Sequence, residues 1–197
     1  MTESATGKAS QAVEIGEKFF EYRDYTPIPI ILLLLISAKP TPASALLGFV
    51  LILIGELWRI YSVSFIGTVS RTRNVETSGA SLVKEGPYGL MRNPLYVGNF
   101  FICMGFAIYG AQLYLVVLTA ALFAVQYYFI VAFEETLMRK KFANEFDDYC
   151  KSVPAWIPSK VPSPNDFTFR NVVPAIASEK RTLTAILVLI GILLLKS

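Results

Sequence analysis

Two segments of the chain hold the side chains best suited to bind or activate a small molecule. Residues 82–99 read LVKEGPYGLMRNPLYVGN, and within them Arg92 and Asn93 stand directly before Pro94. Proline is favoured in the first turn of a helix and asparagine is a common N-cap, so a helix is predicted to begin at Pro94. A helix N-terminus attracts anions, and Arg92 adds a full positive charge beside it. This segment therefore predicts an anion-binding position.

The second segment, residues 134–158, reads EETLMRKKFANEFDDYCKSVPAWIP and opens with two adjacent carboxylates, Glu134 and Glu135. Ionised carboxylates accept hydrogen bonds from hydroxyl and ammonium groups, and one beside an amine can also take its proton. Apolar side chains recur among the charged ones over residues 134–149, which is typical of an amphipathic helix. We therefore expect the carboxylates to stand at the start of such a helix.

Two apolar runs, residues 94–109 and 113–133, lie between these segments and are joined only by residues 110–112. So short a joint between two long helices predicts a tight antiparallel hairpin. The two polar segments then meet at one end of the hairpin. The side chains expected to come together there are Arg92, Asn93, Tyr96, Glu134 and Glu135.

Further apolar runs predict more membrane helices. Residues 43–66 are long enough to cross a bilayer, which takes roughly 20 helical residues, whereas 27–38 and 183–195 are shorter. The run 43–66 carries two charged residues, Glu56 and Arg59, which lie three residues apart on one face of the predicted helix. With 54% hydrophobic and 17% charged residues, the chain is predicted to be an all-α integral membrane protein of about five transmembrane helices.

The distribution of basic residues orients this arrangement. With five spans, nearly all lysines and arginines fall on the side of the N-terminus and the two polar segments, and only Lys39 and Lys196 fall opposite. By the positive-inside rule, the N-terminus and the two polar segments are expected to face the cytosol, where soluble cofactors can reach them. Residues 1–25 have no apolar core, so no cleavable signal peptide is predicted.

Several classes of site are excluded by composition. Histidine is absent, which removes the commonest general base and metal ligand. Cys103 and Cys150 have no nearby partner, so neither a disulfide framework nor a metal site is predicted. The basic residues of the tail are dispersed among prolines and acids, which favours a membrane-lipid surface over a nucleic-acid site.

The two polar segments together resemble the isoprenylcysteine carboxyl methyltransferase and phospholipid N-methyltransferase superfamily of membrane proteins. Its pattern is G-P-Y-x-x-x-R-H/N-P-x-Y before a hairpin, then Glu-Glu and F-G-x-x-Y-x-x-Y-x-x-x-V-P. The matching residues are Gly86, Pro87, Tyr88, Arg92, Asn93, Pro94, Tyr96, Glu134, Glu135, Phe142, Tyr149, Val153 and Pro154. Two positions depart from the pattern, since Asn93 replaces the more frequent histidine and Ala143 replaces glycine.

The resemblance implies an S-adenosylmethionine-dependent methyltransferase acting on a lipophilic small-molecule or lipidated acceptor in the membrane. It implies Arg92 and Glu135 as catalytic residues. Arg92 would pair with a carboxylate of donor or acceptor, the glutamates with hydroxyl and ammonium groups, and tyrosine faces with the sulfonium. The implied cofactor-binding residues are Gly86, Pro87, Tyr88, Arg92, Asn93, Pro94, Tyr96, Gly98, Glu134 and Glu135.

The resemblance covers roughly residues 82–158, and together with hydropathy it predicts a division of the chain. Residues 1–26 form a cytosolic or interfacial segment, 27–66 a transmembrane hairpin, 67–158 the methyltransferase core with its hairpin at 94–133, and 159–197 a tail with the last membrane segment.

Alternatives remain open at this point. A membrane sterol or enone reductase would bind NADPH instead, and a non-enzymatic scaffold would bind neither cofactor. The pair Glu56 and Arg59 either neutralises itself or serves a function, and Tyr127 and Tyr128 are expected in an interfacial aromatic belt.

Overall fold

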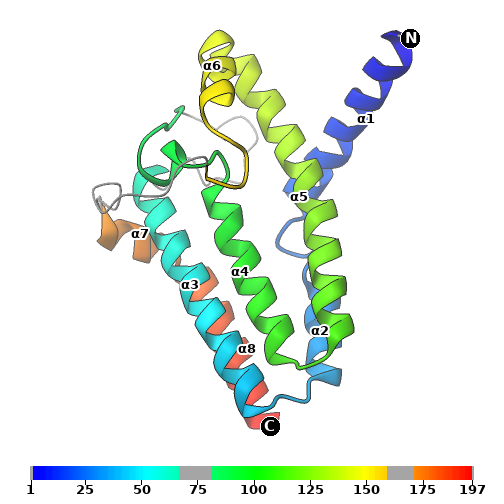
Figure 1. Cartoon of the computed structure of the whole chain (residues 1–197), viewed down its shortest axis with the longest axis vertical. Helices are drawn as coiled ribbons and strands as arrows, with labels where there is room; N and C mark the ends of the chain where they lie inside the picture. Colours follow the sequence, from blue (N-terminus) through cyan, green and yellow to red (C-terminus); the bar gives the residue numbers. More distant parts are fainter. Residues whose placement is uncertain (1, 67–80, 159–170, 197) are drawn as a thin grey trace.

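The computed structural model describes residues 2–66, 81–158 and 171–196, with side chains from residue 11 onward. All regular elements in these ranges are helical (Figure 1), so the predicted all-α class is confirmed. In chain order they are α1 (Thr2–Glu21), α2 (Ile28–Ser37), α3 (Pro42–Ile66), the 3₁₀ turn η2 (Gly86–Gly89), α4 (Pro94–Tyr109), α5 (Leu113–Phe142), α6 (Asn144–Ser152), α7 (Val172–Ser178) and α8 (Lys180–Lys196).

Among the described helices, α3 and α5 are long and apolar enough to cross a membrane, and α2 and α4 are shorter apolar helices. Both long helices expose large apolar side chains, such as Leu46 and Leu53 on α3 and Leu122 on α5. Exposed apolar surface of this extent is typical of a face that contacts lipid. The chain is thus a helical, membrane-associated protein, and two of its described helices are long and apolar enough to span a bilayer.

The hairpin of α4 and α5 forms as predicted, but its second helix is longer than expected. We expected a membrane helix to end at Phe133 and an amphipathic helix to follow, whereas α5 continues to Phe142. No proline or glycine interrupts residues 134–142, and Glu, Leu, Met, Arg and Lys are good helix formers. The break comes at Ala143, whose φ is +43°, and α6 begins directly after it.

Four glycines bring α3 and α4 into close antiparallel contact. A Cβ atom on Gly48 would lie 2.7 Å from the carbonyl oxygen of Gly105, and one on Gly55 would lie 2.7 Å from that of Gly98. The two glycines of α3 are seven residues apart, and so are the two glycines of α4. The contacting positions of the two helices therefore match in register. Small residues let membrane helices approach closely, and this pair forms the rigid centre of the bundle.

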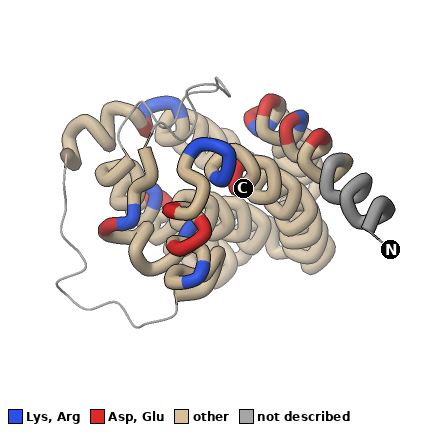
Figure 2. The backbone as a smooth tube through the Cα atoms, turned by 90° about the horizontal axis from the view of Figure 1, so that it is seen from above, with Lys and Arg blue, Asp and Glu red and all other residues tan. Residues whose placement is uncertain are grey.

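The bundle has two distinct ends. At the far end, the backbone N–H of Lys39 donates to the Gly110 carbonyl at 3.0 Å, and the Lys196 ammonium donates to the carbonyls of Leu35 and Ile36. At the other end, called here the polar end, lie η2, α6 and the start of α4 (Figure 1). Seen from above, charged residues of both signs lie on the helices and connections around that end (Figure 2).

The N-terminal segment also packs on the bundle. Phe19 stacks on Phe129 of α5 with ring centroids 6.0 Å apart, and Phe20 contacts Phe133. The residues after α1 therefore lie near the polar end of α5. Residues 67–80 of the predicted methyltransferase core and residues 159–170 of the predicted tail lie outside the described residues.

Candidate active site

Arg92 stands at the centre of the polar end, between α4, α5 and the turn after α6. Its Nε and Nη2 atoms donate to Oε1 of Glu135 at 3.2 and 2.6 Å. Its Nη1 atom donates to the carbonyls of Val153 at 2.7 Å and Cys150 at 3.4 Å. Within the described part of the chain, four of the five guanidinium N–H groups thus have partners, and one on Nη2 has none there and could meet a ligand.

The backbone around Arg92 is fixed to the same turn. Its N–H donates to the Pro154 carbonyl at 2.8 Å, and the N–H of Asn93 donates to the Ala155 carbonyl at 3.2 Å. Helix α4 begins directly after Asn93 as predicted, but the Asn93 side chain makes no capping bond, and its Nδ2 donates to the same Ala155 carbonyl at 3.1 Å. The start of α4 is therefore held by residues 150–155.

The two adjacent glutamates have different environments. Glu135 pairs with Arg92, and its second oxygen lies 3.7 Å from the exposed guanidinium of Arg139. Glu134 instead accepts a hydrogen bond from the Tyr96 hydroxyl at 2.7 Å. The hairpin therefore brings together Arg92, Tyr96 and both glutamates, as the spacing of the two segments predicted.

Tyr88 and Tyr149 join η2 to α6. The hydroxyl of Tyr149 donates to the backbone carbonyl of Tyr88 at 2.7 Å. Burial raises the pKa of the Tyr149 hydroxyl, so it stays protonated and keeps donating at neutral pH. This contact fixes the backbone of η2 at Tyr88 against α6.

A cavity of about 1550 Å³ runs from this cluster toward the middle of the bundle. At the polar end its lining includes Tyr88, Arg92, Asn93, Pro94, Tyr96, Glu134, Glu135 and Tyr149. Deeper, it is lined by Asn99, Ile102 and Cys103 of α4, Tyr127 of α5, and Thr182, Ala185 and Val188 of α8. One continuous space therefore joins a charged region to a largely apolar one.

Three residues predicted to bind a cofactor do not line this cavity. Gly86 has φ +57°, and a Cβ there would lie 2.4 Å from the ring of Phe65. Pro87 is fully buried in η2. A Cβ on Gly98 would lie 2.6 Å from Cγ of Arg59. Each of these residues serves local packing, whereas the cofactor-binding and catalytic roles of the other predicted residues stay predictions.

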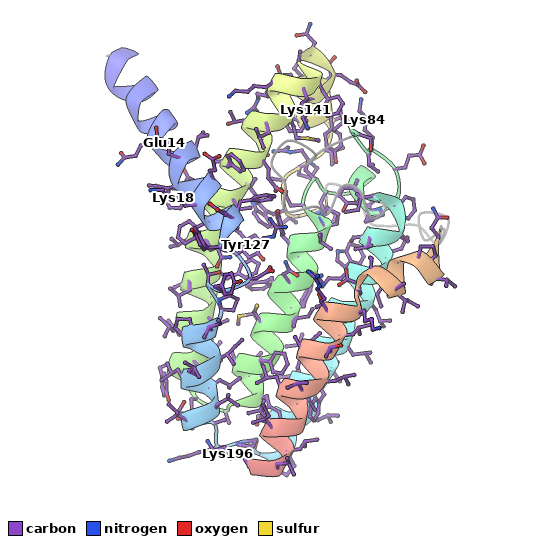
Figure 3. The ribbon with its side chains drawn as sticks, turned by 180° about the vertical axis from the view of Figure 1, so that it is seen from behind. Glu14, Lys18, Lys84, Tyr127, Lys141 and Lys196 are labelled. Atoms are coloured by element: carbon purple, nitrogen blue, oxygen red, sulfur yellow. The ribbon has the colours of Figure 1, made fainter. Side chains whose placement is uncertain are left out.

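Sequence reasoning missed the deeper part of the cavity. Tyr127 was expected in an interfacial belt, but it packs against Tyr96 with ring centroids 4.6 Å apart and faces α4 (Figure 3). The Asn99 amide donates to its hydroxyl at 2.8 Å. A polar Asn99 six residues into an apolar run was the available signal, because a polar side chain at membrane depth needs a partner.

The intramembrane pair of Glu56 and Arg59 has a third member. The Nε of Arg59 lies 3.5 Å from Glu56, but its Nη2 lies 2.7 Å from Glu179, which is fully buried at the junction of α7 and α8. Sequence analysis left open whether the pair neutralises itself, and the structure shows that the shorter contact of Arg59 is with Glu179 of the tail.

The match to known protein families follows the same part of the chain. The model of the phospholipid methyltransferase family matches residues 43–145, which include α3, η2, α4, α5 and both glutamates. The chain belongs to the phospholipid methyltransferase family. Membership indicates a membrane methyltransferase, which agrees with the resemblance found in the two polar segments.

Two curated relatives are similar to this chain over the same length. The nickel-cobalt-cadmium resistance protein NccN of Alcaligenes xylosoxydans xylosoxydans is 31% identical over 113 residues, which are 57% of this chain and 47% of that protein. The cobalt-zinc-cadmium resistance protein CzcN of Cupriavidus metallidurans gives the same identity and coverage. The chain spans about half the length of these relatives over the matched region. No solved structure matches it.

Proposed function

We propose that this phospholipid methyltransferase family member transfers a methyl group from S-adenosylmethionine to a lipophilic acceptor that enters from the bilayer. The observation that carries the proposal is the continuous cavity. Its polar end offers carboxylates, a cation and aromatic faces, and its deeper part between α4, α5 and α8 adds the apolar side chains Ile102, Ala185 and Val188 to a few polar ones. A polar donor and an apolar acceptor can therefore meet inside one space.

The residues at the polar end fit the chemistry of this donor. S-adenosylmethionine supplies an activated methyl group on a sulfonium, together with a carboxylate, an ammonium and ribose hydroxyls. Glu134 and Glu135 would accept hydrogen bonds from the ammonium or the hydroxyls. The remaining N–H of Arg92 would donate to the carboxylate, and the faces of Tyr88 and Tyr96 would attract the sulfonium.

The contribution of this chain to catalysis would be positioning and exclusion of water. Methyl transfer is an in-line displacement that needs two reactants held in contact more than it needs a strong acid or base. Arg92 would fix the cofactor region by holding Glu135 and the 150–155 turn together. Glu134 would take a proton where the acceptor carries one.

The proposal includes a membrane topology with the polar end toward the cytosol. Five apolar helices lie in the membrane: α2, α3, α4, α5 and α8. The positions of Lys39 and Lys196 at the far end support this orientation, because basic residues are depleted from the translocated side.

Transfer of labelled methyl groups tests the function. The detergent-purified chain would be incubated with S-adenosylmethionine labelled in its methyl group and with a total lipid extract, and label entering the organic phase would be measured. We expect transfer by the wild type and a loss of about 100-fold in Glu134→Gln. The matched control is Glu145→Gln on α6, whose exposed side chain pairs only with Lys84 among described residues and should change transfer less than about twofold.

A folded wild type that labels no lipid fraction would contradict the proposal. Equal losses in the two glutamine variants would contradict the role given to Glu134.

A further inference from the structure

The turn between α1 and α2 brings a second arginine to the polar end of the cavity. Arg23 and Asp24 of this turn line the same space as Tyr96 and Glu134, although the family model matches only residues 43–145. Neither residue of the turn belongs to the two polar segments that carry the resemblance. The N-terminal segment therefore contributes charge to a site that the matched core does not wholly contain.

Arg23 is held in place by the packing of α1 on α5. Its Cζ atom lies 4.1 Å from the ring centroid of Phe20, and its Nη1 donates to the Phe20 carbonyl at 3.1 Å. Phe20 is buried, and its ring centroid lies 5.6 Å from that of Phe133, the residue directly before Glu134. The guanidinium is therefore anchored near the turn of α5 that carries the two glutamates.

Arg23 keeps most of its hydrogen-bonding capacity. In the described part of the chain, its guanidinium has one hydrogen-bond partner, the carbonyl of Phe20, and it forms no ion pair there. A guanidinium carries five N–H groups, so four of them remain for a ligand. Arg92 differs, because most of its N–H groups have partners and Glu135 neutralises its charge. Arg23 therefore has more donors and more uncompensated charge to offer an anion than Arg92 has.

Glu134 is the carboxylate that complements Arg23. It accepts a hydrogen bond from the Tyr96 hydroxyl at 2.7 Å, and no lysine or arginine forms an ion pair with it within the described ranges. The charge of Arg23 nevertheless acts on both Glu134 and Tyr96 without direct contact. The polar end thus holds one contacting ion pair, Arg92 with Glu135, and one separated pair, Arg23 with Glu134.

A separated pair of opposite charges suits a ligand that is itself a zwitterion. The amino acid end of S-adenosylmethionine carries an ammonium and a carboxylate on the same carbon atom. The ammonium would donate to Glu134, and the carboxylate would accept from the planar fork of Arg23. The contacting pair would gain less from such a ligand, because Arg92 and Glu135 already bind each other.

Resting on the proposed function, we propose that Arg23 is a donor-binding residue that pairs with the carboxylate of S-adenosylmethionine. The N-terminal segment then forms part of the cofactor site and selects a donor with an intact amino acid end. The remaining N–H of Arg92 adds to this contact, while Arg92 mainly holds Glu135 and the 150–155 turn in place. Arg23 forms and breaks no covalent bond, so its contribution is affinity and selectivity for the donor.

Two ligands that differ only in the carboxylate test the proposal: S-adenosylmethionine and its decarboxylated form. Each would be titrated into the detergent-purified full chain by calorimetry. Arg23→Gln removes the charge but keeps a side chain that can donate to the Phe20 carbonyl. We expect this variant to bind S-adenosylmethionine at least about tenfold more weakly than the wild type, as for a lost hydrogen bond between charged groups. It should bind the decarboxylated form with unchanged affinity, which also shows that it is folded.

Two further variants separate the position and the shape of the charge. Lys18→Gln is the matched control, because it removes the same charge from an exposed position on α1 that is not among the described residues lining the cavity (Figure 3). It should leave the affinity for both ligands unchanged. Arg23→Lys keeps the charge but loses the fork, so it should bind S-adenosylmethionine with an affinity between those of the wild type and Arg23→Gln.

The outcomes distinguish this inference from the proposed function. Equal weakening of both ligands in Arg23→Gln overturns the inference, because a loss that does not need the carboxylate arises elsewhere in the fold. Unchanged affinity of that variant for S-adenosylmethionine, or an equal loss in Lys18→Gln, also overturns it. A folded wild type that binds neither ligand contradicts the proposed function instead.

Discussion

At the residue scale, the side chains that the sequence singled out do meet, but several have different partners from those expected. Arg92 was predicted to pair with a carboxylate of the donor or acceptor. In the structure, most of its N–H groups donate hydrogen bonds to Glu135 and to the carbonyls of residues 150 and 153. Asn93 was predicted to cap α4 and instead holds Ala155. Spacing along the chain predicts which residues share an end of the hairpin, whereas it does not reveal how a turn such as 150–155 folds back onto them.

Ala143 gives a prediction about stability. It has φ +43° and ψ −121°, a conformation that costs an L-residue about 1–3 kcal/mol and that glycine adopts readily. Family members usually carry glycine at this position, so Ala143→Gly should raise stability by about 1 kcal/mol. Thermal unfolding in detergent, followed by circular dichroism, would show a higher Tm.

The control for this prediction is Ala124→Gly, at an exposed position in the middle of α5. There the same substitution should lower stability by about 1 kcal/mol, since glycine is a poor helix former. A fall in Tm for both variants would contradict the strain assigned to Ala143.

At the element scale, hydropathy alone located α2, α3, α4, α5 and α8 and the joint between α4 and α5. The extension of α5 to Phe142 was not predicted, because a change from apolar to charged composition was taken as a helix boundary although no helix-breaking residue marks one. The contact of Glu179 with Arg59 was also out of reach, since it joins residues 120 positions apart. Contacts of that kind depend on how helices pack, and the sequence of either helix does not encode the other's position.

The glycines between α3 and α4 give a prediction at this scale. Gly105→Ala would place a Cβ atom 2.7 Å from the carbonyl oxygen of Gly48, so the two backbones would have to separate. We expect a loss of about 1–3 kcal/mol, the usual cost of overpacking. Unfolding in detergent would measure it.

Gly191→Ala on α8 is the matched control, because a Cβ there would meet nothing within 4 Å. It should leave stability unchanged or raise it slightly. Equal destabilisation by the two substitutions would show that close approach of α3 and α4 is not what the glycines provide.

At the scale of the whole molecule, the chain is a helical bundle with a polar end, a far end with Lys39 and Lys196, and one cavity that joins charge to apolar surface. The family match covers residues 43–145, but the cavity is also lined by parts outside it, including the junction of α1 and α2 and the helix α8. The matched core holds Arg92 and both glutamates. The surrounding helices are therefore where we expect differences in acceptor between family members to arise.

The central claim is that S-adenosylmethionine binds at the polar end of this cavity. Calorimetry on the detergent-purified chain tests it most directly, with Arg92→Ala, with Lys151→Ala as a control, and with NADPH as a second ligand. Lys151 is an exposed cation on α6 that pairs with Asp148 at 2.8 Å. The account predicts that S-adenosylmethionine binds the wild type and Lys151→Ala alike, that Arg92→Ala binds it at least about tenfold more weakly, and that NADPH gives no binding. A folded wild type that binds NADPH, or that does not bind S-adenosylmethionine, would contradict the account.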